Sequence, residues 1–328
     1  MGNKTLIISL FLIAEVINVT ESIRIATRRS PLAIWQADFV KAKISKLNPG
    51  LKVELVAMNT KGDQALDAAL SGIGGKGLFI NELESALLDG HADIAVHSLK
   101  DMPNTLSEDF CLGAVCARGN PCDALVTNLS SSLKNLKPGS VVGTSSLRRR
   151  SQLLAAHPHL EVKEIRGNVN TRLDKLDGGS YHAIILASIG LERLNLHHRI
   201  SSRLSIKEML PAPGQGAIAV QCKVIDESIK SLILPLHDRI SGFCVAAERS
   251  VSARLNGNCQ VPIAAYAELV RGSNEIVLRA MVGSIDGTSI LCAQDRDCPN
   301  NAVKLGNRVG DKLLGLGADK ILSDVARI

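Results

Sequence analysis

Six arginines in this chain share one placement, near the predicted start of a helix or just after a predicted strand. They are Arg28, Arg148, Arg149, Arg166, Arg172 and Arg193. Helix N-termini attract anions through free N–H groups and the helix dipole. Arginine adds planar, bidentate donors whose charge-assisted hydrogen bonds contribute about 1.5–3 kcal/mol each. A single arginine is usually a solvated surface residue, but six placed alike favour a cleft that binds a small polycarboxylate.

Three consecutive hydroxyl side chains, Thr144, Ser145 and Ser146, come shortly before two of these arginines. A plain helix N-cap needs only one of the three. Beside two arginines, the hydroxyls and their backbone N–H groups favour a cradle for a carboxylate or a phosphate.

One carboxylate, Asp101, follows Lys100 directly after a predicted strand, and Pro103 keeps a helix from starting at once. A carboxylate that faces an arginine-rich cleft is attracted to it. The spacing alone equally allows an ion pair with Lys100 or an aspartate that only forms a turn.

Cys259 lies in the stretch 257–260, Gly-Asn-Cys-Gln, which predicts a turn between a helix and a strand. Free cysteines are usually buried as small apolar residues, whereas a cysteine on a polar loop suggests a reactive thiol or a point of covalent attachment. The eight cysteines contain no CxxC pair, and no histidine pair has the spacing that would complete a zinc site. A chain this long needs no disulfides, so we expect reduced thiols and a cytosolic location.

The segment 72–77, Gly-Ile-Gly-Gly-Lys-Gly, formally matches GxGxxG. It lacks the preceding strand of a dinucleotide site, and no Ser or Thr follows Lys76 as in a P-loop. The pattern therefore favours a glycine-rich lid that carries Lys76 over a nucleotide site.

One pattern that could bring these residues together recurs along the chain: a short aliphatic run, then a polar loop, then a helix. The runs are 23–27, 92–96, 140–143, 162–165 and 183–187. After the first run, Ser30 and Pro31 supply an N-cap and a proline at the first helical position. Alternating strands and helices predict parallel sheets, whose strand C-termini meet at one edge where ligands bind. We therefore expect the polar residues to converge.

The pattern changes after Pro211. A turn-rich connector, 211–216, enters a strand at 217–222, and helices follow at about 226–236 and 242–255. Consecutive antiparallel strands are predicted at 261–269 and 275–282, with a closing helix at about 301–316. We expect a small α+β domain from near residue 239, and 328 residues allow two to three domains in all.

The composition narrows the partners. Aromatic residues are 2% of the chain, so the cores must be aliphatic, and single-stranded nucleic acid, which binds on aromatic platforms, is disfavoured. The net charge of +6 is spread without any like-charge run longer than three residues, which suits small anions better than a duplex.

The first twenty residues allow two interpretations. Lys4 followed by the apolar stretch 6–13 is similar to a secretory signal, but Glu15 interrupts it and no clear cleavage site follows. The stretch is too short to span a membrane. A dispensable or misassigned N-terminal extension over residues 1–21 is the preferred interpretation.

Six segments together resemble the porphobilinogen deaminase family, from about residue 23 to near the C-terminus. They are 24–33 (RIATRRSPLA), 74–79 (GGKGLF), 95–101 (AVHSLKD), 142–149 (VGTSSLRR), 166–169 (RGNV) and 258–262 (NCQVP). The resemblance implies an α/β fold of two periplasmic-binding-protein-like lobes with mainly parallel sheets, plus a small C-terminal α+β domain. By it, domain 1 is 22–116 with 217–236, domain 2 is 117–216 and domain 3 is 237–328.

The family joins four porphobilinogen units head to tail into the linear tetrapyrrole hydroxymethylbilane. The resemblance implies a dipyrromethane cofactor held through a thioether on Cys259. It makes Asp101 the catalytic aspartate, which stabilises the positive charge that develops as ammonia leaves and assists proton transfer. The six arginines then bind the acetate and propionate groups of the pyrroles.

Further residues take supporting roles by the same resemblance. Lys76 and Phe79 belong to the lid, and the supporting contacts are Ser30, Ser98, Lys100, Thr144, Ser145 and Ser146. It also implies a cytoplasmic monomer whose partner is porphobilinogen, with no nucleic acid, membrane or metal. About twenty residues precede the first family segment, and Arg150 has no site role.

A non-enzymatic anion-binding protein, exported by the N-terminal apolar stretch, is the alternative. It needs neither Asp101 nor Cys259 and has no third domain. A phosphate-handling transferase that uses the glycine-rich segment is less well supported.

Overall fold

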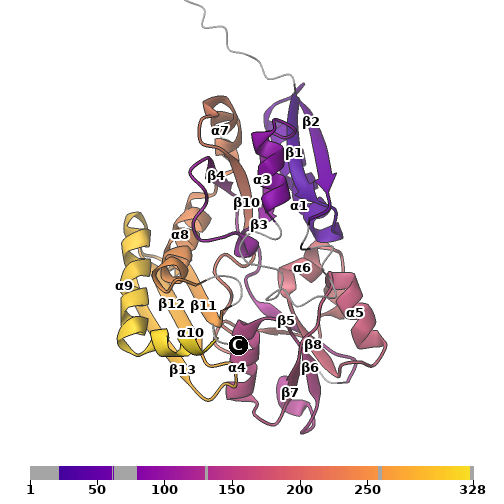
Figure 1. The fold of residues 1–328 in the computed structure, drawn as a ribbon, viewed down its shortest axis with the longest axis vertical. Coiled ribbons are helices and arrows are strands. Elements are labelled where there is room, and N and C mark those ends of the chain that lie inside the picture. The colour runs from indigo at the N-terminus through magenta and orange to yellow at the C-terminus, as the bar shows by residue number, and fades with distance from the viewer. Residues whose placement is uncertain (1–21, 61, 63–79, 130–131, 258–260, 326–328) are drawn as a thin grey trace, which may run out of the picture.

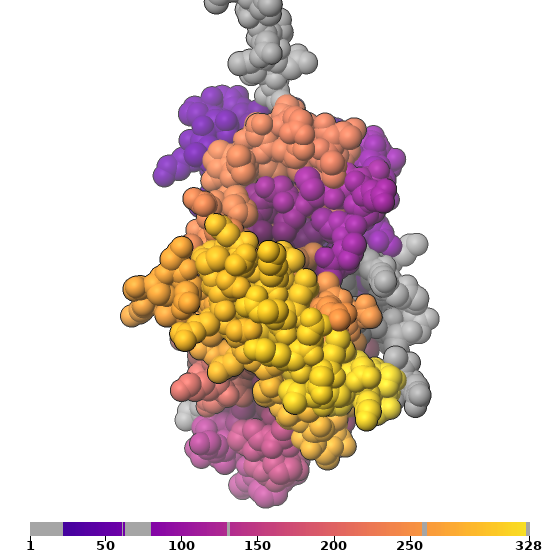
Figure 2. Space-filling view, turned by 90° about the vertical axis from the view of Figure 1, so that its left-hand side faces the viewer, coloured from indigo at the N-terminus to yellow at the C-terminus, as the bar shows by residue number. Residues whose placement is uncertain are grey.

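The computed structural model describes residues 22–60, 62, 80–129, 132–257 and 261–325, and these contain three β-sheets. The first sheet occupies the upper part of the molecule in Figure 1, the second the lower right and the third the lower left. Figure 2 shows the yellow C-terminal residues covering the middle of one face, between the purple residues of the first sheet and the magenta residues of the second. The α/β fold class is confirmed.

The first sheet has five strands in the order β2-β1-β3-β10-β4. Their bounds are β1 (Ser22–Arg28), β2 (Lys52–Met58), β3 (Ile94–Ser98), β4 (Phe110–Val115) and β10 (Ile218–Lys223). β1 runs parallel to β2 and β3, whereas β10 runs antiparallel to both of its neighbours, β3 and β4. The sheet is therefore mainly parallel, with one strand from much later in the chain inserted between two early ones.

The second sheet repeats this plan in the order β7-β6-β8-β5-β9. Its bounds are β5 (Asp123–Val126), β6 (Val141–Gly143), β7 (Glu161–Lys163), β8 (Ala183–Ala187) and β9 (Ser202–Leu204). β6 is parallel to β7 and β8, and β5 is antiparallel to β8 and β9. The chain thus crosses between the sheets twice, and the strand after each crossover, β5 or β10, runs against its neighbours. The recurring strand–helix pattern did not reveal these two reversals.

The third sheet is antiparallel in the order β11-β12-β13. Its strands are β11 (Ile263–Leu269), β12 (Ile276–Gly283) and β13 (Ile290–Asp297), packed against α8 (Arg239–Arg254), α9 (Ala302–Gly315) and α10 (Ala318–Val325). The predicted pair of consecutive antiparallel strands is confirmed, but β13 and α10 were missed. β13 has no fully buried residue, and its charged end, with Asp295 and Asp297, concealed the strand pattern.

Helices begin where the sequence supplies caps. α1 (Pro31–Leu47) starts as predicted, with the Ser30 side chain accepting a hydrogen bond from the Ala33 N–H. The remaining longer helices are α3 (Asn81–Leu88), α4 (Leu147–Ala156), α5 (Val169–Asp177), α6 (Ser188–Arg193) and α7 (Glu227–Ile233). α8 starts three residues before the predicted position, because Asp238 caps it through the Ser241 N–H.

The cores are aliphatic, as the composition predicts. The largest fully buried side chains are all isoleucine or leucine, among them Ile25, Ile94 and Ile184. Each such side chain contributes about 1.5–3 kcal/mol relative to an exposed one. Within the described residues, no helix combines the length and hydropathy needed to cross a bilayer.

Candidate functional site

Asp101 closes a short 3-10 turn, Leu99–Asp101, that follows β3 directly. Lys100, in the same turn, lies among charges from both five-stranded sheets. Its pKa is lowered to about 8, mainly by burial. The charges of Asp101 and Asp123 oppose this shift and those of Arg149 and Arg148 add to it, with Asp101 the largest of the four effects. The C-terminal end of β3 therefore faces the start of α4, as the convergence of strand ends predicted.

Asp123 is a fully buried carboxylate that holds Arg148 and Arg149 together at the start of α4. Arg149 donates to its Oδ1 from Nη2 (2.7 Å) and Nε (3.1 Å), and Arg148 donates to Oδ2 from Nη2 (2.8 Å). Burial alone would raise the pKa of Asp123, but the two arginines hold it well below the usual range. Gln215 adds a donor to the same carboxylate at 3.0 Å.

Asp123 was not predicted from the sequence. The one signal there is that Asp123 begins an otherwise apolar run, Asp-Ala-Leu-Val, which the structure shows as the fully buried strand β5. Arg148 and Arg149, expected to bind a ligand, are thus also held by the protein itself: Arg148 donates to the carbonyl of Leu210 (2.7 Å) and Arg149 to that of Ile185 (2.9 Å). These bonds fix the guanidinium groups in place, and their part in ligand binding stays a prediction.

Arg166 and Arg172 extend the same positive region. Burial lowers the pKa of Arg172 to about 10; neighbouring Arg149 and Arg166 lower it too, while Asp101 raises it. Its Nε donates to the Gly167 carbonyl at 2.8 Å. Arg166 pairs with the exposed carboxylate of Glu164 at 2.9 Å. We call this set the charged cluster: Lys100, Asp101, Asp123, Arg148, Arg149, Arg166 and Arg172.

Arg193 occupies a different place, between α6 and α1. Its Nη2 donates to the Gly216 carbonyl at 2.9 Å, and its guanidinium lies 5.3 Å from the centre of the Trp35 ring. Burial lowers its pKa to about 10. Gly216 lies in the chain segment that returns from the second sheet to the first, just before β10. Arg193 therefore ties this segment to α6 and, through Trp35, to α1. Arg28 lies at the end of β1, near enough to His97 for its charge to affect that ring.

The hydroxyl groups predicted as supporting contacts bond within the protein. The Ser146 side chain caps α4 through the Arg149 N–H, Thr144 accepts from the Ser146 N–H (3.2 Å), and Ser145 donates to the Ile165 carbonyl (2.6 Å). Ser98 and Gln36 form a side-chain hydrogen bond at 2.8 Å. They therefore shape the strand ends around the charged cluster.

Three predicted site residues, Lys76, Phe79 and Cys259, lie outside the described residues. Nothing in the structure bears on the lid or on the cysteine as an attachment point.

The charged cluster fits a polycarboxylate cofactor. It contains five cationic side chains and two carboxylates, so positive charge exceeds negative even when the carboxylate of Glu164 is added. In the described part of the chain, the buried Nε of Arg148 has no hydrogen-bond acceptor. Such a donor favours an added acceptor, and a carboxylate is the acceptor that guanidinium groups bind most strongly. The described residues contain no group of three or more histidine, cysteine, aspartate or glutamate side chains that could hold a metal ion.

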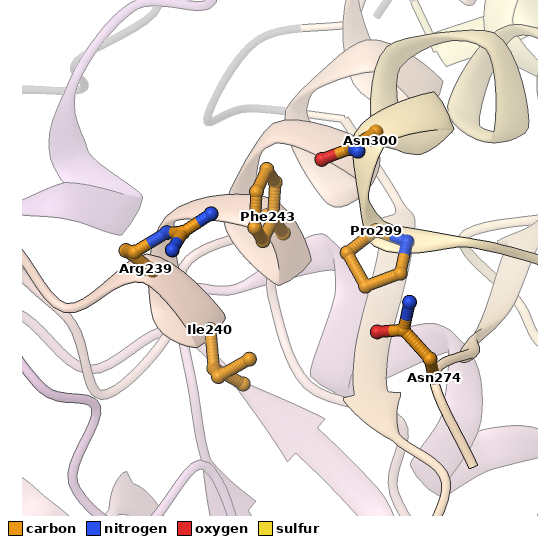
Figure 3. Close-up of a pocket in the computed structure, with 6 residues that line it drawn as sticks. All are labelled: Arg239, Ile240, Phe243, Asn274, Pro299 and Asn300. Atoms are coloured by element: carbon orange, nitrogen blue, oxygen red, sulfur yellow. The ribbon is translucent and has the colours of Figure 1, made fainter.

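Two concave regions lie away from the cluster. One, of about 400 Å³, is lined by the N-terminal turn of α8 and by loops of the third sheet (Figure 3). Another, of about 500 Å³, is lined by residues of α4 and the third sheet. Neither lining includes a member of the charged cluster, so the site is defined by its charges and contacts.

Two family models match the chain. "Porphobilinogen deaminase, dipyromethane cofactor binding domain" matches residues 23–231, and "Porphobilinogen deaminase, C-terminal domain" matches residues 242–315.

The solved structures to which the chain is similar include three bacterial proteins. The BvgS periplasmic VFT2 domain of Bordetella pertussis is 15% identical, with 66% of this chain and 86% of that one covered and a TM-score of 0.41. A periplasmic substrate-binding protein of an ABC transporter from Coxiella burnetii is 15% identical, covering 66% and 92%, with a TM-score of 0.43. A nutrient-binding protein of Burkholderia cenocepacia bound to methionine is 14% identical, covering 64% and 90%, with a TM-score of 0.42. Scores at this level support no conclusion about the ligand.

Proposed function

The chain belongs to the porphobilinogen deaminase family, and from this premise we propose that it condenses four porphobilinogen molecules head to tail on a dipyrromethane attached by a thioether to Cys259, then releases hydroxymethylbilane. Membership makes it a transferase of tetrapyrrole synthesis that uses a dipyrromethane cofactor. It also decides against the non-enzymatic anion-binding protein considered above.

The observation that carries the proposal is the position of Asp101 beside a surplus of buried and partly buried cations. Lys100 and Arg172 both have lowered pKa values because burial disfavours their charge. An anionic ligand would offset that penalty at both positions. The acetate and propionate groups of linked pyrroles supply such anions, and we assign Arg148, Arg149, Arg166 and Arg172 to hold them.

Asp101 would act where positive charge develops. As ammonia leaves the aminomethyl group, charge is shared onto the pyrrole nitrogen, and a carboxylate hydrogen-bonded to that N–H stabilises it. Asp101 would also accept and return protons as the new ring regains aromaticity. When bound, the cofactor supplies a terminal pyrrole with a free α-carbon as the nucleophile.

The remaining assignments follow from the family resemblance. We keep the three-domain division at residues 22–116 with 217–236, 117–216 and 237–328, and propose a cytoplasmic monomer. Arg28, Arg193 and the hydroxyls of Ser30, Ser98, Thr144, Ser145 and Ser146 are proposed as binding or supporting residues, and Lys76 and Phe79 as lid residues.

The direct test replaces Asp101. We expect Asp101→Asn to keep its fold and its cofactor mass while turnover falls by about 10²–10⁴-fold, the usual range for a lost acid–base group. Asp109→Asn, at an exposed carboxylate eight positions later, is the matched control and should remain fully active. Normal turnover in Asp101→Asn would overturn the proposed role.

A further inference from the structure

Asn104 lies three residues after Asp101 and joins that segment to the C-terminal end of α8. Its Nδ2 donates to the Ser252 hydroxyl at 2.8 Å and to the Gly257 carbonyl at 2.7 Å. Arg249, on the same helix, donates from Nη2 to the carbonyls of Pro103 (2.7 Å) and Asn104 (2.9 Å). Both hydrogens of the Asn104 amide are therefore used on one helix end.

The partner side of this link is rigid. The Gly257 N–H donates to the Ser252 carbonyl at 2.8 Å, and Asn256 before it has a left-handed φ of 50°. A Cβ at position 257 would meet Ile263 Cδ1 at 2.5 Å and Ser252 Oγ at 3.0 Å, so a side chain there would require these neighbours to shift. The Gly257 carbonyl that Asn104 contacts therefore lies in a closely packed turn.

The link lies close to the proposed catalytic residue. Asp101 is three residues from Asn104. At no more than about 3.6 Å per residue, this stretch spans at most about 11 Å. A change at Asn104 therefore acts on the position of the Asp101 carboxylate.

We propose that Asn104 is a positioning residue, which holds the segment that carries Asp101 against the end of α8 and so sets the position of the Asp101 carboxylate in the site; this inference rests on the proposed function. Arg249 already fastens the 103–104 backbone to α8. Asn104 adds a side-chain contact that reaches beyond the helix to the Gly257 carbonyl. Its role is thus alignment rather than attachment of the loop.

The test is Asn104→Leu, which keeps the side-chain size and removes both donors. We expect intact mass to show full cofactor loading and the KM for porphobilinogen to stay within about two-fold, while kcat falls about ten-fold, because small misplacements at a reacting centre reduce rate steeply. Ser252→Ala, which removes one of the two hydrogen bonds, should lower kcat by a smaller factor. Asn128→Leu, at an exposed asparagine whose amide bonds Asp177 at 3.3 Å, is the matched control.

Wild-type kcat in folded, loaded Asn104→Leu overturns the inference. So does a loss of activity that simply follows the unloaded fraction, since that indicates a structural role. If Asn104→Leu fails to fold, Ser252→Ala is the deciding variant: a lower kcat with an unchanged KM supports the inference, and a wild-type kcat overturns it. A wild-type protein at the bare chain mass that forms no tetrapyrrole from porphobilinogen would instead overturn the proposed function itself, so the two failures are distinguishable.

Discussion

Two fully buried carboxylates, Glu248 and Asp123, each pair with buried arginine, but they differ in how completely they are matched. Glu248 accepts hydrogen bonds from Arg118 Nη1 (2.5 Å) and Nη2 (3.2 Å) and from the backbone N–H groups of Gly214 (2.7 Å) and Ala267 (2.7 Å). One positive charge meets one negative charge. This pair joins the second connection between the five-stranded sheets, at Gly214, to the third sheet, at Ala267. Within the described residues, neither partner has a buried side-chain nitrogen or oxygen without a hydrogen bond.

Asp123 instead faces two arginines, with Lys100 close enough to respond to its charge. Within the described residues, Arg148 Nε and Gln215 Oε1 beside it have no hydrogen-bond partner. The difference separates a closed structural pair from a site that can accept a further anion. A buried charge without full compensation destabilises a protein, and under the proposed function a bound anionic ligand would recover that stability.

Glu248→Gln should have the largest effect on stability. It leaves the buried Arg118 guanidinium without its counter-charge, which typically destabilises by about 3–5 kcal/mol. Glu268→Gln, at a half-exposed pair with Arg279, is the control, expected below about 1 kcal/mol. Denaturant unfolding measures both. Equal small losses would show that the Glu248 pair is not structural.

Asp123→Asn should lower the free energy of unfolding by an amount that depends on the cofactor. In the unloaded background Cys259→Ser, two buried arginines lose their counter-charge, and we expect a loss of about 3 kcal/mol or more. In the loaded enzyme, ligand carboxylates replace part of that charge, so the loss should be smaller by about 1–2 kcal/mol. Glu248→Gln should give the same loss in both backgrounds. An Asp123→Asn effect independent of loading would contradict the comparison.

The smallest expected effect is on pH dependence. Since the pKa of Lys100 is lowered to about 8, its side chain is charged below that pH and loses its charge as the pH rises through it. Binding of carboxylates should then weaken, and kcat/KM, which reports the free enzyme, should fall about ten-fold above pH 8. Lys100→Arg keeps its charge, so the fall in kcat/KM should move to higher pH. An unchanged profile in Lys100→Arg would exclude Lys100 as its source.

The elements that depend on local sequence were predictable. Ser30 and Pro31 mark the start of α1. The strand predicted at 140–143 ends at Gly143 as expected, and the one predicted at 92–96 ends two residues later, at Ser98. These features depend on caps and on short apolar runs, which a few neighbouring residues determine.

Features that depend on distant pairing were not predictable. β10 lies between β3 and β4 although more than a hundred residues separate it from either, and its reversed direction leaves no mark in its apolar sequence. Asp123 and Glu248 look like ordinary acidic residues, since the arginines that define them lie 25 and 130 positions away. Only the folded chain shows that one carboxylate is matched and the other is not.

The intact mass of the purified protein tests the central claim most directly. The account predicts a mass above that of the bare chain by two linked pyrroles, and the bare mass in Cys259→Ser. A wild-type protein at the bare chain mass, with no tetrapyrrole formed when porphobilinogen is added, would contradict it.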